Sequence, residues 1–371
     1  MPLVLRKVLS LTETIIFLCP SLSGGGAEKA TFDLAKVLSE HYDVHFIGIY
    51  QPKDRFEFSK TDVKVHALIK NNDSQSKIIK IWLFLVAYFR FIKYVNLNKP
   101  YIIHANCEAP ELILALTFGK FRRFVTIHVD EQWKFAKFLG QLVRKLLFLE
   151  KTKFVVVSTH IKTVYGLNNP NCDFIPNILS GDLSNFYNFR ENKPLAGNPI
   201  KGIAFVGRLH KQKNPFMVLE FAIQTQLPLI LVGSGSLLKK ILDEATSRNF
   251  HKITVFPFDN KPWEKIPSDY LTLVPSIYEG DGLVAFEALT LHRPVLLSRI
   301  AAFERFQLPT RFYFNDIKDL VENNDFNVHK NDWYCLSDKE YEEFARKQIV
   351  PRLPHHVMSQ ILKIYEINPQ F

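Results

Sequence analysis

The sequence has few cysteines, and they form no framework. Only four occur in 371 residues, and Cys19, Cys107, Cys172 and Cys335 are far apart. Without a C-x-x-C pair, this spacing favours neither a zinc site nor the disulfide framework of a small secreted domain. We therefore expect free thiols and a reducing, cytoplasmic location.

Long hydrophobic runs are also missing. The most apolar segment, Ile81 to Phe89, is about half of the roughly 20 residues that cross a bilayer. Near the N-terminus, Arg6-Lys7 and the apolar stretch from Thr14 to Leu18 lack the length and cleavage site of a secretory signal. The stretch predicts a buried strand, and we expect no membrane-spanning segment.

The sequence lacks recognisable nucleic-acid and metal motifs. It has no helix-turn-helix signal, zinc-finger spacing, RNA-binding aromatic motif or D-x-D carboxylate cluster. The net charge of +10 nevertheless calls for an anionic partner, which can be a phosphate, a nucleic acid or an acidic lipid surface. Because the basic residues are spread over both halves, we expect no nucleic acid, and a basic nucleic-acid-binding protein is the more distant alternative.

Strand-like and helix-like segments alternate from end to end, which predicts the α/β class. Strands are expected at 14–18, 44–49, 101–104, 124–127 and 154–157, and again at 202–206, 229–232, 253–256, 271–274 and 295–298. This pattern predicts two Rossmann-like, doubly wound parallel-sheet domains facing a cleft. Their limits are placed at 1–185 for the first domain and 199–354 for the second, with a C-terminal helix in 355–371 packing back on the first.

Three segments combine glycine or charge with the end of an expected strand. Gly24-Gly25-Gly26-Ala27-Glu28 precedes a helix expected from Lys29 to Ser39, so backbone N–H groups can approach an anion there. Gly207-Arg208-Leu209-His210-Lys211-Gln212-Lys213 follows the strand that ends at Val206. Asn214 and Pro215 begin the next helix, so Arg208 and Lys213 lie in the loop before it and can hold a diphosphate.

The third segment runs from Pro275 to Leu289. Glycines surround Asp281 in a turn, a helix is expected to begin at about Asp281, and Glu279 and Glu287 flank its start. The first N–H groups of such a helix are free for a phosphate or sugar oxygen. Carboxylates accept hydrogen bonds from vicinal hydroxyls, as on a sugar or ribose.

The spacing of Glu279 and Glu287 resembles the E-x7-E signature of glycosyltransferase family 4, whose members are retaining enzymes with the GT-B fold of two Rossmann-like domains. Arg208 and Lys213 match that family's G-R-L-x-x-x-K, and weaker matches extend over nearly the whole chain. These weaker matches are Gly25 to Glu28, Ile103-His104-Ala105, Thr126-Ile127-His128, Val157-Ser158 and Ile175-Pro176-Asn177.

The resemblance implies that 1–185 is the acceptor-side domain and 199–354 the nucleotide-sugar domain. It also implies roles for individual residues. Arg208 and Lys213 would bind the donor diphosphate, Glu287 the ribose, and Glu279 with the amides of Asp281, Gly282 and Leu283 the sugar. His128 would lie near the donor sugar and count as catalytic with Glu279, Arg208 and Lys213. Gly25, Gly26 and the nucleobase segment ending at Phe258 complete the donor-binding set.

Two positions depart from the family pattern. Asp281 stands where an apolar residue is common, and His292-Arg293 replaces the usual small residue before Pro294. Asp281 can cap the helix or recognise a donor hydroxyl or amine. Because of this departure, the sequence does not transfer a donor identity from the family.

The resemblance implies a retaining transfer from a nucleoside-diphosphate sugar to a glycan or lipid-linked acceptor, in bacterial cell-surface polysaccharide or lipopolysaccharide synthesis. No cofactor or metal is expected, because cations and helix N–H groups can stabilise the leaving phosphate. A nucleotide-sugar epimerase or a phosphorylase-like enzyme on the same fold is the nearer alternative.

Two basic, apolar segments run from Lys77 to Lys93 and from Lys134 to Lys153. They fit helices that lie on an anionic membrane surface, which would make the protein peripheral on the inner face of the cytoplasmic membrane. The alternative is a pair of core helices, each with a solvated face.

Overall fold

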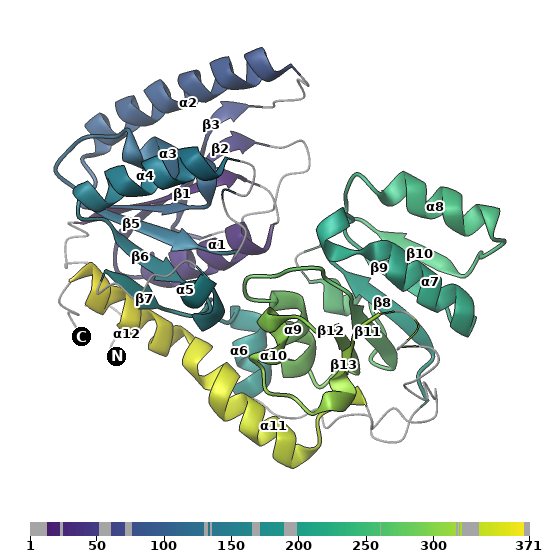
Figure 1. Cartoon of the computed structure of the whole chain (residues 1–371). Helices are drawn as coiled ribbons and strands as arrows, with labels where there is room; N and C mark the ends of the chain where they lie inside the picture. The colour runs from purple at the N-terminus through teal and green to yellow at the C-terminus, as the bar shows by residue number, and fades with distance from the viewer. Residues whose placement is uncertain are drawn as a thin grey trace. The chain divides into compact units, whose positions relative to one another are not determined.

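The computed structural model of the chain divides into two compact units (Figure 1): unit 1 contains Met1–Ile178 and Pro354–Phe371, and unit 2 contains Leu179–Leu353. The residues that the structure describes are 13–22, 25–51, 61–70, 76–129, 133, 136–164, 171–188, 199–259, 261–316, 318, 320 and 334–366.

Unit 1 is built on a parallel sheet of seven strands in the order β3-β2-β1-β4-β5-β6-β7. The strands are β1 (Thr14–Ser21), β2 (Asp43–Gln51), β3 (Lys64–Lys70), β4 (Ile102–Asn106), β5 (Arg122–Ile127), β6 (Lys153–Val156) and β7 (Cys172–Phe174). Successive side chains of a strand point to opposite faces of the sheet, and both faces are buried. In β1, Ile16 and Leu18 enter one core, whereas Ile15 and Phe17 enter the other.

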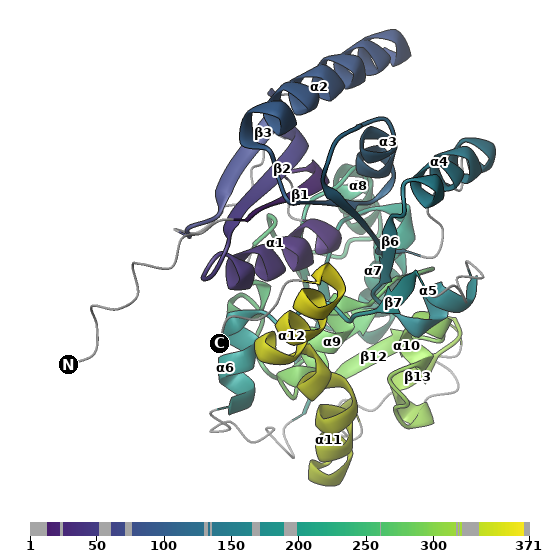
Figure 2. The same cartoon turned by 90° about the vertical axis from the view of Figure 1, so that its left-hand side faces the viewer.

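Helices cover both faces of this sheet. They are α1 (Gly26–Leu38), α2 (Lys77–Asn98), α3 (Glu108–Ala115), α4 (Lys137–Leu149), α5 (Thr159–Val164) and α12 (Pro354–Tyr365). Helices α2, α3 and α4 contribute to the core with Ile16, and α1 and α12 to the core with Ile15. Figure 2 shows α12 beside α1, so the last helix of the chain completes the first unit.

Unit 2 repeats the plan with a parallel sheet in the order β10-β9-β8-β11-β12-β13. The strands are β8 (Gly202–Val206), β9 (Leu229–Val232), β10 (Ile253–Phe256), β11 (Tyr270–Val274), β12 (Val295–Ser298) and β13 (Tyr313–Phe314). Leu296 faces the core that α7 and α8 cover, and Val295 and Leu297 face the core of α9 and α11.

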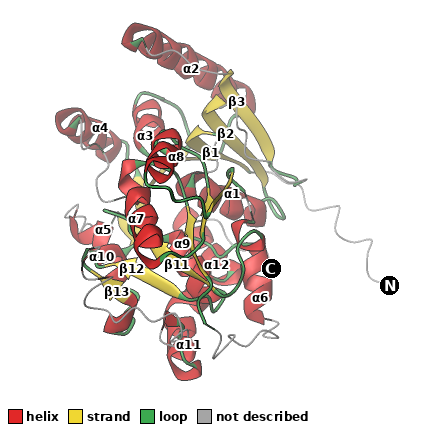
Figure 3. Ribbon diagram, turned by 90° about the vertical axis from the view of Figure 1, so that its right-hand side faces the viewer, coloured by secondary structure: helices red, strands yellow, loops and turns green. Residues whose placement is uncertain are grey.

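Figure 3 shows the helices that flank this second sheet. They are α6 (Gly181–Asn188), α7 (Pro215–Thr225), α8 (Leu238–Ser247), α9 (Leu283–Thr290), α10 (Ala301–Glu304) and α11 (Asp338–Phe344). Short 3-10 turns cover Lys211–Lys213, Pro262–Glu264, Thr310–Phe312 and Val350–Arg352, and a π-helical turn covers Ala345–Ile349.

The boundary between the units lies earlier than the sequence suggests. Leu179 and Leu183 pack with Ala285 and Phe286 of α9 in a core of unit 2. The predicted limit at 185 therefore falls inside unit 2, because these two leucines need the apolar face of α9 for burial.

The strand order of each sheet reverses at one point, between β1 and β4 in unit 1 and between β8 and β11 in unit 2. The predicted fold class, two Rossmann-like parallel-sheet domains, is confirmed. Ligands of such sheets bind beyond the carboxyl ends of the strands at the point of reversal. Gly25 follows β1, Arg208 follows β8 and Glu279 follows β11, so these residues lie where that rule places a ligand.

Within the described part of the chain, no helix is both long and apolar enough to cross a membrane.

Candidate active site

The turn after β8 is shaped by close contact between two backbone segments. Gly207 donates from its N–H to Val232 O at 3.0 Å, and Leu209 donates to Ser234 O at 2.9 Å. A Cβ on Gly233, whose φ is +150°, would lie 1.9 Å from Gly207 O. Glycine at 233 thus allows the turns after β8 and β9 to lie against each other.

Lys213 and Glu279 form an ion pair across this end of the sheet. Lys213 Nζ donates to Glu279 Oε1, and Ser276 Oγ donates to the same oxygen at 2.8 Å. The side chains of Lys213 and Glu279 are 17% and 9% exposed. The loop after β8 and the loop after β11 therefore meet through opposite charges.

Gln212 fixes the same two loops through the backbone. Its side-chain amide donates to Tyr278 O at 3.0 Å, and its carbonyl accepts from Ile277 N at 2.8 Å. Lys213 ends a 3-10 turn that begins at Lys211. The lysine therefore leaves a defined turn rather than the open loop that the sequence predicts.

Arg208 is exposed, and its guanidinium forms no ion pair or hydrogen bond with the other residues that the structure describes. The structure does not bring Arg208 into contact with Lys213 or Glu279. Its guanidinium keeps all its donors for an anion from solution.

Glu287 lies on α9 and is nearly buried, with 7% of its surface exposed. Its Oε2 accepts a hydrogen bond of 2.9 Å from Trp263 Nε1. Nothing in the local sequence marks Trp263 as a site residue, because a tryptophan between two strands is as typical of a core as of a site. Its partnership with a carboxylate 24 positions away appears only in the folded chain.

Arg293 holds the segment that carries Trp263. Its guanidinium donates to the carbonyls of Trp263 at 2.8 Å and Ile266 at 2.9 Å, and it lies over the Trp263 ring at 5.2 Å. Burial lowers the pKa of this guanidinium to about 10. The departure at position 293 therefore has a structural reason, because the arginine replaces solvent around several backbone carbonyls.

The turn that precedes α9 differs in detail from the prediction. The helix begins at Leu283, two positions beyond the expected start at Asp281, and Gly282 occupies the N-cap position with a φ of +66°. A Cβ at Gly282 would also lie 2.5 Å from the Phe303 ring. The amides of the first helical turn, which begins at Leu283, have no intrahelical acceptor and can donate to a ligand.

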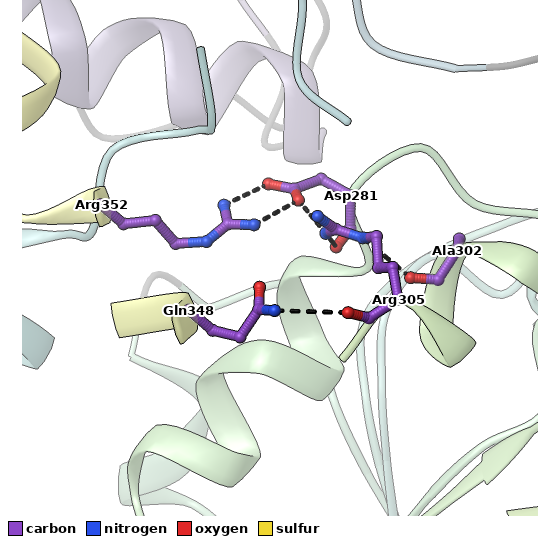
Figure 4. A network of polar contacts seen from close by, with 5 residues as sticks. All are labelled: Asp281, Ala302, Arg305, Gln348 and Arg352. Carbon is purple, nitrogen blue, oxygen red and sulfur yellow. Dashed lines mark hydrogen bonds and ion pairs between the residues drawn. The ribbon is translucent and has the colours of Figure 1, made fainter. Parts of the chain in front are cut away.

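Asp281 does not cap this helix, so that prediction is wrong. Its carboxylate instead receives two hydrogen bonds of 2.7 Å from the guanidinium of Arg352, and Arg305 donates to it from another side (Figure 4). The side chains of Asp281 and Arg352 are 3% and 2% exposed. The sequence gives no signal for this arrangement, since the arginines are 24 and 71 positions away.

Phe258 follows β10 on the same end of the second sheet. Its backbone N–H donates to Ser234 Oγ at 3.3 Å, and its side chain is 40% exposed. An exposed aromatic ring beside a backbone turn is able to stack on a planar ligand.

His128, Gly25 and Gly26 belong to unit 1. His128 follows β5, and its Nε2 lies 2.9 Å from Asn106 Oδ1, which also accepts from Thr31 Oγ1 at 3.1 Å. This network links the end of β5 to the end of β4 and to α1.

The two glycines mark the start of α1, which begins three residues before the predicted Lys29. Gly25 is its N-cap residue and Gly26 its first residue. Glu28 in the first turn accepts a hydrogen bond from Ser21 Oγ at 3.3 Å. Gly24 lies outside the described residues.

A small pocket in unit 1 is lined in part by His104, Asn106, Thr126, His128 and Asn177. His104 is fully buried between Tyr365 Oη and Thr126 Oγ1, each 2.6 Å away. Burial lowers the pKa of His104 to about 3, so this imidazole is neutral at physiological pH. Among the described residues, no group of three or more His, Cys, Asp and Glu side chains could hold a metal ion.

Comparison with known proteins also points to the part of the chain that contains Arg208, Lys213, Glu279 and Glu287. Residues 188–306 match the family described as glycosyl transferases group 1. A curated Campylobacter jejuni protein, N-acetylgalactosamine-N,N'-diacetylbacillosaminyl-diphospho-undecaprenol 4-alpha-N-acetylgalactosaminyltransferase, is 24% identical over 290 residues. The alignment covers 72% of this chain and 76% of that protein.

Solved structures match the fold over almost the whole chain. Anabaena HepE in complex with UDP and glucose superposes with a TM-score of 0.74 at 14% identity, covering 95% of this chain and 99% of HepE. WaaG, a glycosyltransferase involved in lipopolysaccharide biosynthesis, superposes with a TM-score of 0.66 at 13% identity, covering 96% and 100%.

Together, the matched domain, the curated relative and the two parallel-sheet units identify the chain as a glycosyltransferase with the GT-B fold.

Proposed function

We propose that the protein transfers a sugar from a nucleoside-diphosphate sugar to a lipid-linked glycan acceptor, with retention of the anomeric configuration. The observation that carries the donor half of this proposal is the cluster at the carboxyl ends of β8 and β11. There Lys213, Glu279 and the start of α9 combine a cation, a carboxylate and free backbone amides. An exposed guanidinium, that of Arg208, follows the same strand end.

This cluster has the charges that sugar transfer requires. When the anomeric C–O bond breaks, negative charge grows on the leaving diphosphate. Cations and helix-terminal amides that already point at that charge stabilise the transition state by roughly 3 kcal/mol for each well-placed donor. Lys213, Arg208 and the first amides of α9 are proposed for this role, and no metal or cofactor is part of the proposal.

Glu287 and Phe258 are proposed to hold the nucleoside. The hydrogen bond from Trp263 fixes the Glu287 carboxylate, and carboxylates accept hydrogen bonds from vicinal hydroxyls such as those of ribose. Phe258 presents its exposed ring at the neighbouring strand end. Because the solved HepE complex contains UDP, uridine is the first base to test.

For the sugar and the acceptor, we propose Glu279, His128 and the turn at Gly25 and Gly26 as the remaining site residues. Retention would follow if the departing phosphate takes the acceptor proton on the same face of the sugar. The name of the curated relative describes transfer to a diphospho-undecaprenol carrier, which supports a lipid-linked acceptor in surface polysaccharide or lipopolysaccharide synthesis.

Exposed apolar and basic side chains of α2 and α4 in unit 1, here called the basic apolar face, support the proposal that the protein acts at a membrane. On α2, the side chains of Ile78, Ile81, Trp82, Leu85 and Phe89 are between 48% and 79% exposed. Apart from the adjacent pair Ile81 and Trp82, neighbouring members of this set are three or four residues apart, which places them on one side of the helix. Such an exposed apolar stripe is the kind that enters the boundary between headgroups and acyl chains.

Helix α4 also presents apolar and basic side chains at the surface. Phe138, Leu142 and Leu149 are 82%, 47% and 72% exposed, and Lys137 and Lys145 are exposed beside them. Neither α2 nor α4 contains an aspartate or glutamate. Both helices cover the same face of the first sheet, so we propose a peripheral location on the anionic, cytoplasmic leaflet. Lys134, at the start of the second predicted segment, lies outside the described residues.

The proposed function is tested by transfer to a lipid-linked acceptor. Purified protein is incubated with UDP-N-acetylgalactosamine, UDP-glucose or their GDP counterparts and with undecaprenyl-diphosphate glycans, and products are separated by mass. We expect one donor to add one sugar, with the same anomeric configuration in product and donor by NMR. Release of sugar phosphate, epimerised donor without transfer, or an inverted product would contradict the proposal.

A further inference from the structure

Asp281 stands at the centre of a buried ion cluster directly beside the proposed donor turn. Arg352 contacts both carboxylate oxygens at 2.7 Å. Arg305 Nη2 donates to the same carboxylate and, at 2.5 Å, to the backbone carbonyl of Asp281. Figure 4 shows the two guanidinium groups approaching Asp281 from opposite sides.

Both arginines are themselves fixed by neighbours. Arg305 Nε donates to Ala302 O at 2.9 Å, and the carbonyl of Arg305 accepts from Gln348 at 3.3 Å. The Arg352 guanidinium lies over the Phe286 ring at 4.6 Å, and its own carbonyl accepts from Leu179 N at 2.8 Å. The cluster therefore ties the turn to segments on both of its sides and to the residue at which the chain enters unit 2.

The turn itself needs such support. Between Glu279 and Leu283, two of the three residues are glycines, and Gly282 adopts a left-handed conformation. Glycine loses more backbone entropy on ordering than any other residue. A turn of this composition holds one conformation only when its surroundings fix it, and Asp281 is the residue through which both arginines reach it.

We propose that Asp281 is a positioning residue, held by Arg352 and Arg305, that fixes Glu279 and the amides at the start of α9 in the geometry that binds the donor. This inference rests on the proposed function of the same turn. The carboxylate acts through the turn and does not recognise the sugar directly, because both of its oxygens are engaged by arginines within the protein.

The two possibilities differ in what the arginine variants do. If Asp281 positions the turn, Arg305→Gln causes the same kind of defect as Asp281→Asn, because both variants lose the contact between Arg305 and the carboxylate. For the same reason, the effect of the double variant is smaller than the sum of the two single effects. If the Asp281 carboxylate binds the sugar directly, the donor kinetics change in Asp281→Asn and not in Arg305→Gln. Arg305→Gln leaves the bidentate pair with Arg352 in place, so this variant folds even if Asp281→Asn does not.

The experiment measures steady-state kinetics with UDP-N-acetylgalactosamine and an undecaprenyl-diphosphate glycan. We expect Asp281→Asn and Arg305→Gln each to raise the donor KM about tenfold and to leave the acceptor KM unchanged. Arg305→Lys, which keeps the positive charge, should bring the donor KM most of the way back to the wild-type value. Arg346→Gln, at an exposed position nearby, serves as the control. Loss of donor use in Asp281→Asn with native kinetics in Arg305→Gln would overturn the proposal.

A second readout separates this inference from the proposed function. Amide hydrogen exchange of the peptide covering 276–286 is measured without any ligand. Faster exchange in Arg305→Gln than in Arg346→Gln supports the positioning role even if the wild type transfers no sugar. Equal exchange in these two variants contradicts the positioning role whatever the enzyme's substrate.

Discussion

Glu111 is a carboxylate on α3 with no exposed surface. Its Oε2 accepts from Trp133 Nε1, and Arg144 lies 4.0 Å from its other oxygen. Desolvation by burial is the main cause that raises its pKa from the ordinary 4.5 to about 7. Because the folded-state pKa is above the unfolded one, Glu111 contributes most to stability below pH 4.5, and this contribution is lost as the pH rises to about 7.

We predict that Glu111→Gln removes this pH dependence. A pKa shift of this size corresponds to about 3 kcal/mol. Between pH 5 and pH 8, the free energy of unfolding of the variant should therefore rise by up to that amount relative to the wild type. The free energy of unfolding is measured in urea at both pH values, with the exposed Glu342→Gln as control. An equal difference between variant and wild type at the two pH values would show that Glu111 is ionised in the folded chain.

Residue types at the donor site could be read from the sequence, but their partners could not. Arg208, Lys213, Glu279 and Glu287 stand out because charged residues follow strand ends. The contacts of Glu287 with Trp263 and of Asp281 with its arginines depend on tertiary structure, since no local spacing brings residues that far apart in sequence together. Of the two interpretations of Asp281, the helix cap does not form, because Gly282 is the N-cap residue and the arginines hold the carboxylate.

The hydrophobic periodicity of the sequence predicts helices and strands more reliably than it predicts contacts between single residues. The predicted strands of both sheets are all present, and their ends either coincide with the prediction or differ from it by up to three residues. The strands β3, β7 and β13 were missed for physical reasons. Strand β3 is a half-exposed edge with lysines at both ends, β7 has three residues and β13 has two, so none carries a continuous apolar run.

Glycines in the second unit allow a direct test at this scale. We predict that Gly233→Ala lowers stability by about 2 kcal/mol or more, because the new Cβ would meet Gly207 O and the φ of +150° strains any L side chain. Gly181→Ala, where no heavy atom lies within 4 Å, is expected to change stability by less than about 1 kcal/mol. Thermal unfolding of the two variants checks this; equal melting temperatures would mean that the turns do not touch.

At the scale of the whole molecule, the basic apolar face predicts binding to anionic vesicles. Replacing Trp82 and Phe89 together by glutamine should weaken binding to phosphatidylglycerol vesicles by roughly tenfold or more, since each buried aromatic ring contributes ~1.5–3 kcal/mol. Leu242→Gln, an exposed leucine on α8, controls for lost apolar surface. Co-sedimentation that is equal for all three proteins, or equal on neutral phosphatidylcholine, would argue that this face has another role.

The donor site is the central claim, and isothermal titration of UDP, GDP and ADP tests it most directly. We predict that the wild type binds one of the three bases preferentially and that Lys213→Ala and Glu287→Gln each weaken this binding at least tenfold, because a hydrogen bond to a charged group contributes about 1.5–3 kcal/mol. Lys211→Ala and Glu342→Gln, at exposed positions of the same unit, should bind as the wild type does. Unchanged affinity in Lys213→Ala and Glu287→Gln, or no binding of any nucleoside diphosphate to the wild type, would contradict the account.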